Sequence, residues 1–169
     1  MGKKRTGSTP ATQVLNRLGI DYCEHHFTHD PAAHSFAQEA ADALGFPPEQ
    51  VFKTLVFAVT GLRAHQGLAV GVVPASGSLH LKNAAAALGY KKATMATPAQ
   101  AERASGYVTG GVSPFGQRTR LPTLVDSSIE GWDSVYVSGG RRGFILSLAP
   151  VDLVRVCDAL VAPIAEGAP

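Results

Sequence analysis

Hydrophobic positions along the chain gather most densely in residues 51–59, with the sequence VFKTLVFAV. Every residue of this stretch except Lys53 is apolar or β-branched, which is typical of a strand buried on both faces. A lysine charge in an apolar interior is costly unless it is paired or reaches water. Lys53 must therefore reach water at an edge, pair with a carboxylate, or stand in a cleft that receives an anion. The sequence leaves these three alternatives open.

Helix-start signals mark most of the expected helices. The pair Thr9-Pro10 fits an N-cap followed by the first helical position. Thr97 with Gln100, and Ser35 with Gln38, each form the pattern of a capping box. We expect helices at residues 10–18, 35–44, 83–88, 98–105 and from residue 150 onward.

Apolar and β-branched runs between these helices predict the strands, at residues 20–27, 51–59, 68–73, 91–95, 123–125, 134–137 and 144–148. The second and third strands are most simply a hairpin with a longer loop, and residues 139–143 are expected to form a tight turn between the last two. Helices and strands alternate early, and strands then follow one another. This order predicts one α/β domain with a mixed sheet and helices packed around it.

Composition changes this picture little. The chain has 169 residues, 45% of them hydrophobic and 17% charged, which fits a single globular domain. It contains no apolar run long enough to span a membrane. Residues 1–8 are basic and no apolar segment follows them, so we expect a flexible basic tail rather than a signal peptide, ahead of a domain at residues 9–169. The net charge of +2 is weak evidence for a polyanionic partner.

The sequence offers no convincing protein nucleophile. Cys23 and Cys157 are widely separated, fall in an expected strand and an expected helix, and have no metal or redox spacing. Such cysteines suit a reducing cytoplasm. Ser113 precedes a proline in a glycine-rich loop instead of standing in the G-x-S-x-G motif of a hydrolase.

A cluster of histidines suggests a zinc site at first sight, because imidazole and carboxylate groups are suitable ligands. On a strand, however, His25 and His26 point to opposite faces. The cluster also lacks a helix that places two histidines four residues apart. We therefore expect no bound metal. The cluster consists of His25, His26, His29, His34 and Asp30.

Two glycine-rich segments could bind an anion. The segment Gly110–Pro114 lets main-chain groups approach a ligand closely, and adjacent N–H groups can form an anion-binding nest. The segment Gly139–Gly143 could be a simple hairpin turn, or Arg141 and Arg142 within it could contact a phosphate. Neither segment carries a Walker or Rossmann pattern.

These segments together resemble the YbaK/EbsC proteins, free-standing relatives of the editing domain inserted in bacterial prolyl-tRNA synthetases. The resemblance runs from about Thr9 to Val161, and its motifs stand in the order and spacing of the family. The motifs that carry it are Val51–Leu55, Gly106–Gln117, Arg120–Thr123 and Tyr136–Gly143.

The resemblance implies a mixed sheet that is partly curled into a barrel. It also implies a trans-editing deacylase that clears Cys-tRNA(Pro), and potentially Cys-tRNA(Cys), by attack of the substrate's own thiol on its ester carbonyl. Such an enzyme needs no cofactor and no metal. The implied partner is the 3′ acceptor end of aminoacylated tRNA, with prolyl-tRNA synthetase as a second candidate partner.

By the same resemblance, Lys53 and Gly110 are the catalytic candidates. Lys53 matches a lysine that holds the phosphate of the terminal adenosine, and Gly110 and Pro114 match the ends of a G-x-x-x-P loop beside the ester. Phe27 stands where better-known members carry tyrosine. The expected substrate-binding residues are Phe27, Phe36, Thr54, Gly111, Ser113, Pro114 and Arg141.

Three other functions stay open from the sequence. The protein could be an Ala-tRNA(Pro) deacylase, because members of the wider family differ in substrate. It could be a non-catalytic tRNA- or nucleotide-binding module that uses Lys53 and the glycine loop for phosphate without turnover. A metal-dependent hydrolase is the remotest alternative.

Overall fold

The computed structural model describes residues 8–167, and the basic segment predicted at residues 1–8 lies outside this range except for Ser8. Its helices are α1 (Pro10–Arg17), α2 (Phe36–Leu44), α3 (Leu81–Ala87), α4 (Pro98–Ser105) and α5 (Pro150–Cys157), with short 3₁₀ segments η1 (Ala64–Gly67) and η2 (Ser127–Gly131). Its strands are β1 (Cys23–His26), β2 (Phe52–Val59), β3 (Leu68–Pro74), β4 (Ser78–Leu79), β5 (Ala93–Met95), β6 (Thr123–Asp126), β7 (Val135–Arg141), β8 (Phe144–Leu148), β9 (Leu160–Ala162) and β10 (Ala165–Glu166).

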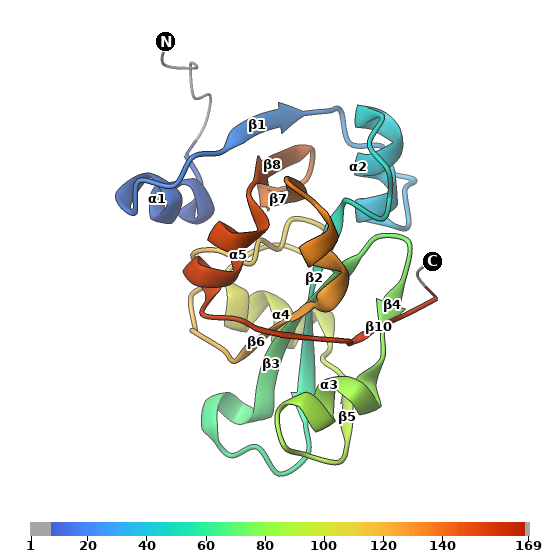
Figure 1. The fold of residues 1–169 in the computed structure, drawn as a ribbon, viewed down its shortest axis with the longest axis vertical. Helices are drawn as coiled ribbons and strands as arrows, with labels where there is room; N and C mark the ends of the chain where they lie inside the picture. The colour runs from blue at the N-terminus through green and yellow to red at the C-terminus, as the bar shows by residue number, and fades with distance from the viewer. Residues whose placement is uncertain (1–7, 168–169) are drawn as a thin grey trace.

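The described strands form three sheets. A five-stranded sheet has the order β5-β2-β3-β6-β9, in which β2 and β3 are antiparallel while β6 is parallel to both β3 and β9. A three-stranded antiparallel sheet has the order β1-β8-β7, and β4 pairs with β10. Figure 1 shows β2 running between the region of β7 and β8 and the region of β5 and α3. The prediction of one α/β domain with mixed pairing is confirmed.

The partial barrel implied by the resemblance has no support in the strand pairing. Within residues 8–167 the five-stranded sheet ends at β5 and β9, which do not pair with each other. An isolated parallel bridge between Val51 and Tyr136 joins this sheet to the three-stranded one. This bridge lies just before β2 begins, and the pairing does not close the two sheets into a cylinder.

Strand β2 is buried on both faces, as its composition predicts. On one face Phe52 and Val56 pack in a core cluster that includes residues of α1 and α5. On the other face Phe57 and Val59 pack in a second cluster that includes alanines of α3. The alternation of side chains along a strand places these pairs on opposite faces. Lys53 lies on the same face of β2 as Phe57 and Val59.

Most helix signals are confirmed, with one exception. Thr97 and Gln100 form the predicted capping box of α4. The box predicted at Ser35 is wrong, because the Ser35 side chain makes no cap hydrogen bond and Gln38 Nε2 instead donates to Asp42 Oδ1 at 2.9 Å. Helix α3 begins at Leu81, two residues before its predicted start, because the His80 side chain accepts from the Asn83 N–H.

The strands differ more from expectation. The predicted hairpin of β2 and β3 is confirmed. Strand β7 continues through both glycines to Arg141 with a register shift, so the predicted five-residue turn is shorter than expected. The short strands β4, β9 and β10 were not predicted.

None of the helices between residues 8 and 167 combines the length and the apolar composition that crossing a bilayer requires.

Candidate active site

A pocket of about 370 Å³ opens beside β2. Strand β5 pairs with β2 at residues 57–59, and the bridge to Tyr136 lies at Val51, so neither partner covers the edge of β2 between them. The pocket lies at this uncovered edge. It is lined by His34, Ser35, Phe36, Ala37, Val51, Phe52, Lys53, Thr54, Leu55, Val56, Met95, Ala96, Pro98, Ala101, Thr109, Gly110, Val112, Ser138 and Ile145.

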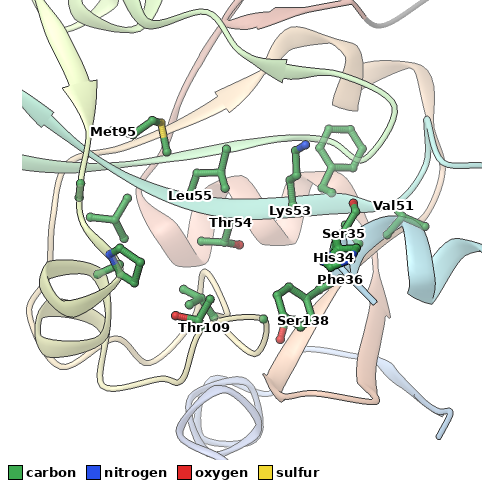
Figure 2. A pocket seen from close by; sticks show the side chains of 18 of the residues that line it. His34, Ser35, Phe36, Val51, Lys53, Thr54, Leu55, Met95, Thr109 and Ser138 are labelled. Atoms are coloured by element: carbon green, nitrogen blue, oxygen red, sulfur yellow. The ribbon is translucent and has the colours of Figure 1, made fainter. Parts of the chain in front are cut away.

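Lys53 brings a cation into this pocket. Its side chain is half-buried, and desolvation lowers its pKa below that of a free lysine. Among the described residues, no Asp or Glu lies within ion-pair distance of its ammonium group. Figure 2 shows Lys53 and Leu55 on one side of β2 and Thr54 on the other, toward Thr109. Of the three alternatives for Lys53, the carboxylate pair is absent from residues 8–167, and the side chain lies in a cleft.

Thr54 places a hydroxyl group on the other side of the strand, within the same pocket. Its Oγ1 is buried and has no hydrogen-bond partner among the described residues. A buried hydroxyl without a partner is costly, so the position of Thr54 is not explained by packing alone.

Gly110 and Phe36 meet at the pocket wall. Gly110 has φ +86°, and a Cβ at this position would lie 2.6 Å from Cδ1 of the Phe36 ring. Phe36 begins α2, and the Arg142 guanidinium lies 5.2 Å from its ring centroid. Arg142 Nε in turn donates to the main-chain oxygen of Thr109 at 2.8 Å. Glycine is therefore required here both by the backbone conformation and by the close approach of the ring.

The ring of Phe36 is supported from a second side by His29. The two ring centroids are 5.5 Å apart, and His29 Nδ1 lies 2.7 Å from Glu39 Oε1. Glu39 also accepts from the main-chain N–H of Asp30. These contacts tie the segment before α2 to the helix that carries Phe36.

The remaining residues of the glycine loop support the site from behind. A Cβ at Gly111 would lie 2.8 Å from Cα of Arg141, so the loop packs directly on the β7–β8 hairpin. Ser113 is fully buried, and its Oγ accepts from the Phe115 N–H at 3.3 Å. The carbonyl of Pro114 accepts from the thiol of Cys157 at 3.4 Å. Gly111, Ser113 and Pro114 do not line the pocket, whereas Val112 of the same loop does.

Two further predicted substrate-binding residues lie away from the pocket lining. The main-chain N–H of Phe27 donates to the carbonyl of Gly143. The exposed Arg141 places its guanidinium 4.3 Å from the ring centroid of Phe144. The structure thus brings Lys53, Thr54, Phe36 and Gly110 together, and it leaves Phe27 and Arg141 on the neighbouring hairpin region.

The comparisons with known proteins identify the family of this chain. The family model for the aminoacyl-tRNA editing domain matches residues 30–156. A protein of Enterococcus faecalis, EbsC, named as a candidate Cys-tRNA(Pro)/Cys-tRNA(Cys) deacylase, is 32% identical over 165 residues, which cover 97% of this chain and 98% of the relative. The chain belongs to the aminoacyl-tRNA editing domain family.

Solved structures of similar fold extend over the same length. A candidate trans-editing enzyme for prolyl-tRNA synthetase is 28% identical with a TM-score of 0.75, and the match covers 95% of this chain and 99% of that one. A hypothetical protein, APE2540, has a TM-score of 0.81 at 23% identity, covering 94% of this chain and all of that one, which supports the fold alone. The resemblance inferred from the sequence motifs is thereby confirmed.

The histidines of this editing domain are used in separate contacts. His25 Nε2 lies 2.8 Å from Ser147 Oγ, whereas His29 contacts Glu39 and His26 lies 3.7 Å from a carboxylate oxygen of Glu24. Across residues 8–167, no three His, Cys, Asp or Glu side chains converge as a metal would require.

Several lining residues of the editing domain carry no local sequence signal. Ser138 reaches the pocket through the pairing of β7, and Met95 through the pairing of β5 with β2. Thr109 directly precedes the predicted glycine loop, and that proximity is the one hint the sequence offers for it. Pairing between distant segments therefore completes a site whose floor, β2, was predicted.

Proposed function

We propose that the protein is a trans-editing aminoacyl-tRNA deacylase whose substrate is Cys-tRNA(Pro), with Cys-tRNA(Cys) as a second substrate. The observation that carries the proposal is Lys53, a half-buried cation without a carboxylate partner among the described residues, in a pocket beside β2. A single cation in a cleft suits an RNA phosphate. The family and the name of the Enterococcus relative support the same substrate class.

In the proposed reaction Lys53 binds the phosphate of the terminal adenosine and so positions the aminoacyl ester. Phe36 and Gly110 form the wall against which the ester lies, and glycine lets the main chain approach it. Orientation of reacting groups can supply a large part of a rate enhancement. The protein is then needed mainly to position the substrate.

The proposed nucleophile is the thiol of the substrate's own cysteine. Its sulfur forms a bond to the ester carbonyl carbon, the bond from that carbon to the ribose oxygen breaks, and the ribose oxygen receives the thiol proton. The products are free tRNA and a cyclic thioester of cysteine, which water then opens. The residues that line the pocket include no Cys, Asp or Glu, which is consistent with a reaction that uses no such group.

The experiment that tests this function is a deacylation assay with tRNA(Pro) charged separately with cysteine, alanine, proline and serine. We expect rapid release of cysteine and much slower release of the others, because a thiol is partly ionised near neutral pH and a hydroxyl or methyl group is not. Preferential release of alanine would establish an Ala-tRNA(Pro) deacylase instead. Binding of all four without release would indicate a non-catalytic tRNA-binding module.

An alanine substrate is the second candidate because part of the pocket wall is small and apolar, namely Ala96, Pro98, Ala101 and Val112. Such a wall fits a methyl group as readily as a thiol, and size alone discriminates weakly between small side chains. We place prolyl-tRNA synthetase among the proposed partners, and adding the synthetase to the assay measures its effect on the rate.

A further inference from the structure

The strongest unexplained feature of the pocket is the polar edge of β2 at Thr54. Its Oγ1 is buried without a hydrogen-bond partner in the described chain, although the residue lines the pocket. Hydroxyl groups in native proteins are rarely left in this state, and an exception calls for a specific explanation. A ligand that completes the missing hydrogen bond is such an explanation.

The main chain of Thr54 points to the same uncovered edge. In an antiparallel sheet the N–H and C=O of successive residues point alternately to the two neighbouring strands. On the pocket side, the carbonyl of Gln50 accepts from the Tyr136 N–H at 3.1 Å and that of Val56 accepts from the Ala96 N–H at 3.2 Å. Thr54 lies between Gln50 and Val56 at an even number of residues from each, so its N–H and C=O point to the same side of β2 as theirs.

The hydrogen bonds at the opposite edge of β2 independently support this direction of the Thr54 main chain. The carbonyl of Val51, which is out of phase with Thr54, accepts from the Ala75 N–H on the β3 side at 2.7 Å. On β3, Val72 is the partner of Thr54. The main chain of Val72 points the same way as that of Val70, whose N–H donates to Pro122 on the side of β3 away from β2. Thr54 and Val72 therefore do not hydrogen-bond to each other. Thr54 therefore presents one N–H, one C=O and one hydroxyl group toward the pocket.

We propose that this edge binds the amino-acid end of the substrate through its free α-amino group. The carbonyl and Oγ1 of Thr54 accept hydrogen bonds from the amino nitrogen, and the N–H of Thr54 donates to the ester carbonyl oxygen. This proposal rests on the proposed deacylase function. It adds a positive requirement for an unmodified amino group, which makes Thr54 a specificity-determining residue.

Two observations favour the amino-acid end over the terminal base. Oγ1 exposes very little surface, so the group that contacts it must be small and must enter deepest. The aminoacyl group is the tip of a charged tRNA and meets this requirement better than a purine ring. The pocket lining also contains no carboxylate, so the acceptors that β2 offers to an amine are the neutral carbonyl and hydroxyl oxygens of Thr54.

An N-acylated substrate should then be rejected. Acetylation removes one amino hydrogen and adds a planar group beside the edge of β2 at Thr54. A site built to hydrogen-bond a particular substrate group discriminates strongly against analogues that cannot make the bond. Aminoacyl-tRNA would be cleaved, while tRNA carrying an N-acylated amino acid would be spared.

The test compares Cys-tRNA(Pro) with N-acetyl-Cys-tRNA(Pro) in the wild type, in Thr54→Val and in Thr54→Ser. Valine has nearly the shape of threonine without the hydroxyl, whereas serine keeps the hydroxyl. We expect Thr54→Val to lower kcat/KM for the free amino substrate by about tenfold and to change that for the acetylated one little. Thr54→Ser should stay close to the wild type on both.

The readout is how each substitution changes the ratio of kcat/KM for the two substrates. A ratio is used because the uncatalysed cleavage rates of the two esters also differ. The melting temperature should stay equal or rise in Thr54→Val, since a buried hydroxyl without a protein partner is replaced by a methyl group. A wild type that cleaves both esters equally, or a Thr54→Val variant that slows both equally, overturns the role of Thr54 and leaves the deacylase function standing. A wild type that cleaves neither overturns both proposals.

Discussion

The ring of Phe36 lies so close to Gly110 that a Cβ at position 110 would stand 2.6 Å from the ring. The two residues come from different parts of the chain, one from the first turn of α2 and the other from the loop after α4. Their contact closes one wall of the pocket. Any side chain at position 110 must move the ring, the loop or both.

Substitution of Gly110 should therefore abolish activity before it abolishes the fold. We expect Gly110→Val to reduce deacylation by at least about a hundredfold, because Phe36 must leave the wall, and to destabilise the protein by roughly 1–3 kcal/mol. Gly19→Ala is the matched control, since Gly19 has φ +68° and nothing within 4 Å of an added Cβ. It carries backbone strain without the clash. Outright unfolding of Gly110→Val would instead mean that the loop is structural.

Removal of the Lys53 charge should separate function from stability. We expect Lys53→Ala to lower kcat/KM by about a hundredfold or more, because the pocket loses its phosphate-binding cation. Unfolding free energy should change by less than about 1 kcal/mol, since no ion pair of the described chain is broken. Lys53→Arg should also be impaired, because a planar fork does not replace a point charge. The exposed Lys82 on α3 provides the control substitution. Wild-type turnover by a folded Lys53→Ala protein would remove Lys53 from the site.

The pH profile offers a second test of the same residue. Desolvation lowers the pKa of Lys53 below that of a free lysine, so its positive charge is lost at a lower pH. Activity that depends on this charge is present at low pH and falls as the pH rises through the lowered pKa. We expect an alkaline decline that begins below the range of free lysine. Lys53→Arg should lack this decline, because arginine keeps its charge. The rates should be measured against the uncatalysed hydrolysis of the ester at each pH.

Local sequence patterns predicted most helices and the central strands of this molecule. Pairing between distant segments determined the short strands and the contacts that form the site. The central strand, its hairpin partner and the capping box at Thr97 follow from short-range composition. The capping box predicted at Ser35 is absent because Ser35 lines the pocket and Gln38 contacts Asp42. Strand β9 is apolar but only three residues long, which is too short a run to mark a strand in the sequence. The motifs suggested the position of Lys53 in the site, but they gave no information that Phe36 would meet Gly110.

Asp126 should make the stability of the fold depend on acid pH. Burial alone would raise the pKa of this carboxyl, but hydrogen bonds from Ser128, Ala165 and Ile164 together hold it below its ordinary value. A carboxyl whose pKa is lower in the folded state contributes stability that is present above its unfolded pKa of about 3.9 and is lost as the pH falls through the folded pKa. Its carboxylate fixes the chain at the start of β10.

We expect Asp126→Ala to destabilise the protein by about 2–4 kcal/mol at neutral pH, because three buried or partly buried main-chain N–H groups lose their acceptor. Asp126→Asn should cost less, since the amide oxygen still accepts. Urea unfolding at several pH values measures this, and the gap between wild type and Asp126→Asn should shrink below about pH 4. A gap that stays constant with pH would show that the charge of Asp126 contributes nothing.

The last prediction concerns the source of the attacking group. Cys157 packs against the carbonyl of Pro114, and burial raises the pKa of its thiol to about 12, so almost none of it is ionised at neutral pH. Neither Cys157 nor Cys23 lines the pocket. A Cys23→Ser, Cys157→Ser double variant should therefore deacylate Cys-tRNA(Pro) at nearly the wild-type rate, since serine at position 157 can still donate to Pro114.

The same variant allows the substrate's thiol to be tested without interference from protein thiols. Ser-tRNA(Pro) should be cleaved at least about a hundredfold more slowly than Cys-tRNA(Pro), because a hydroxyl is scarcely ionised near neutral pH whereas a thiol with a pKa near 8.5 partly is. The two side chains are close in size, so a pocket that selects by volume could not separate them to this extent. Trapping of the cyclic thioester by a free amine would identify the product directly. Comparable rates on the two esters would point to an attacking water, with the exposed His34 at the pocket as the first residue to substitute.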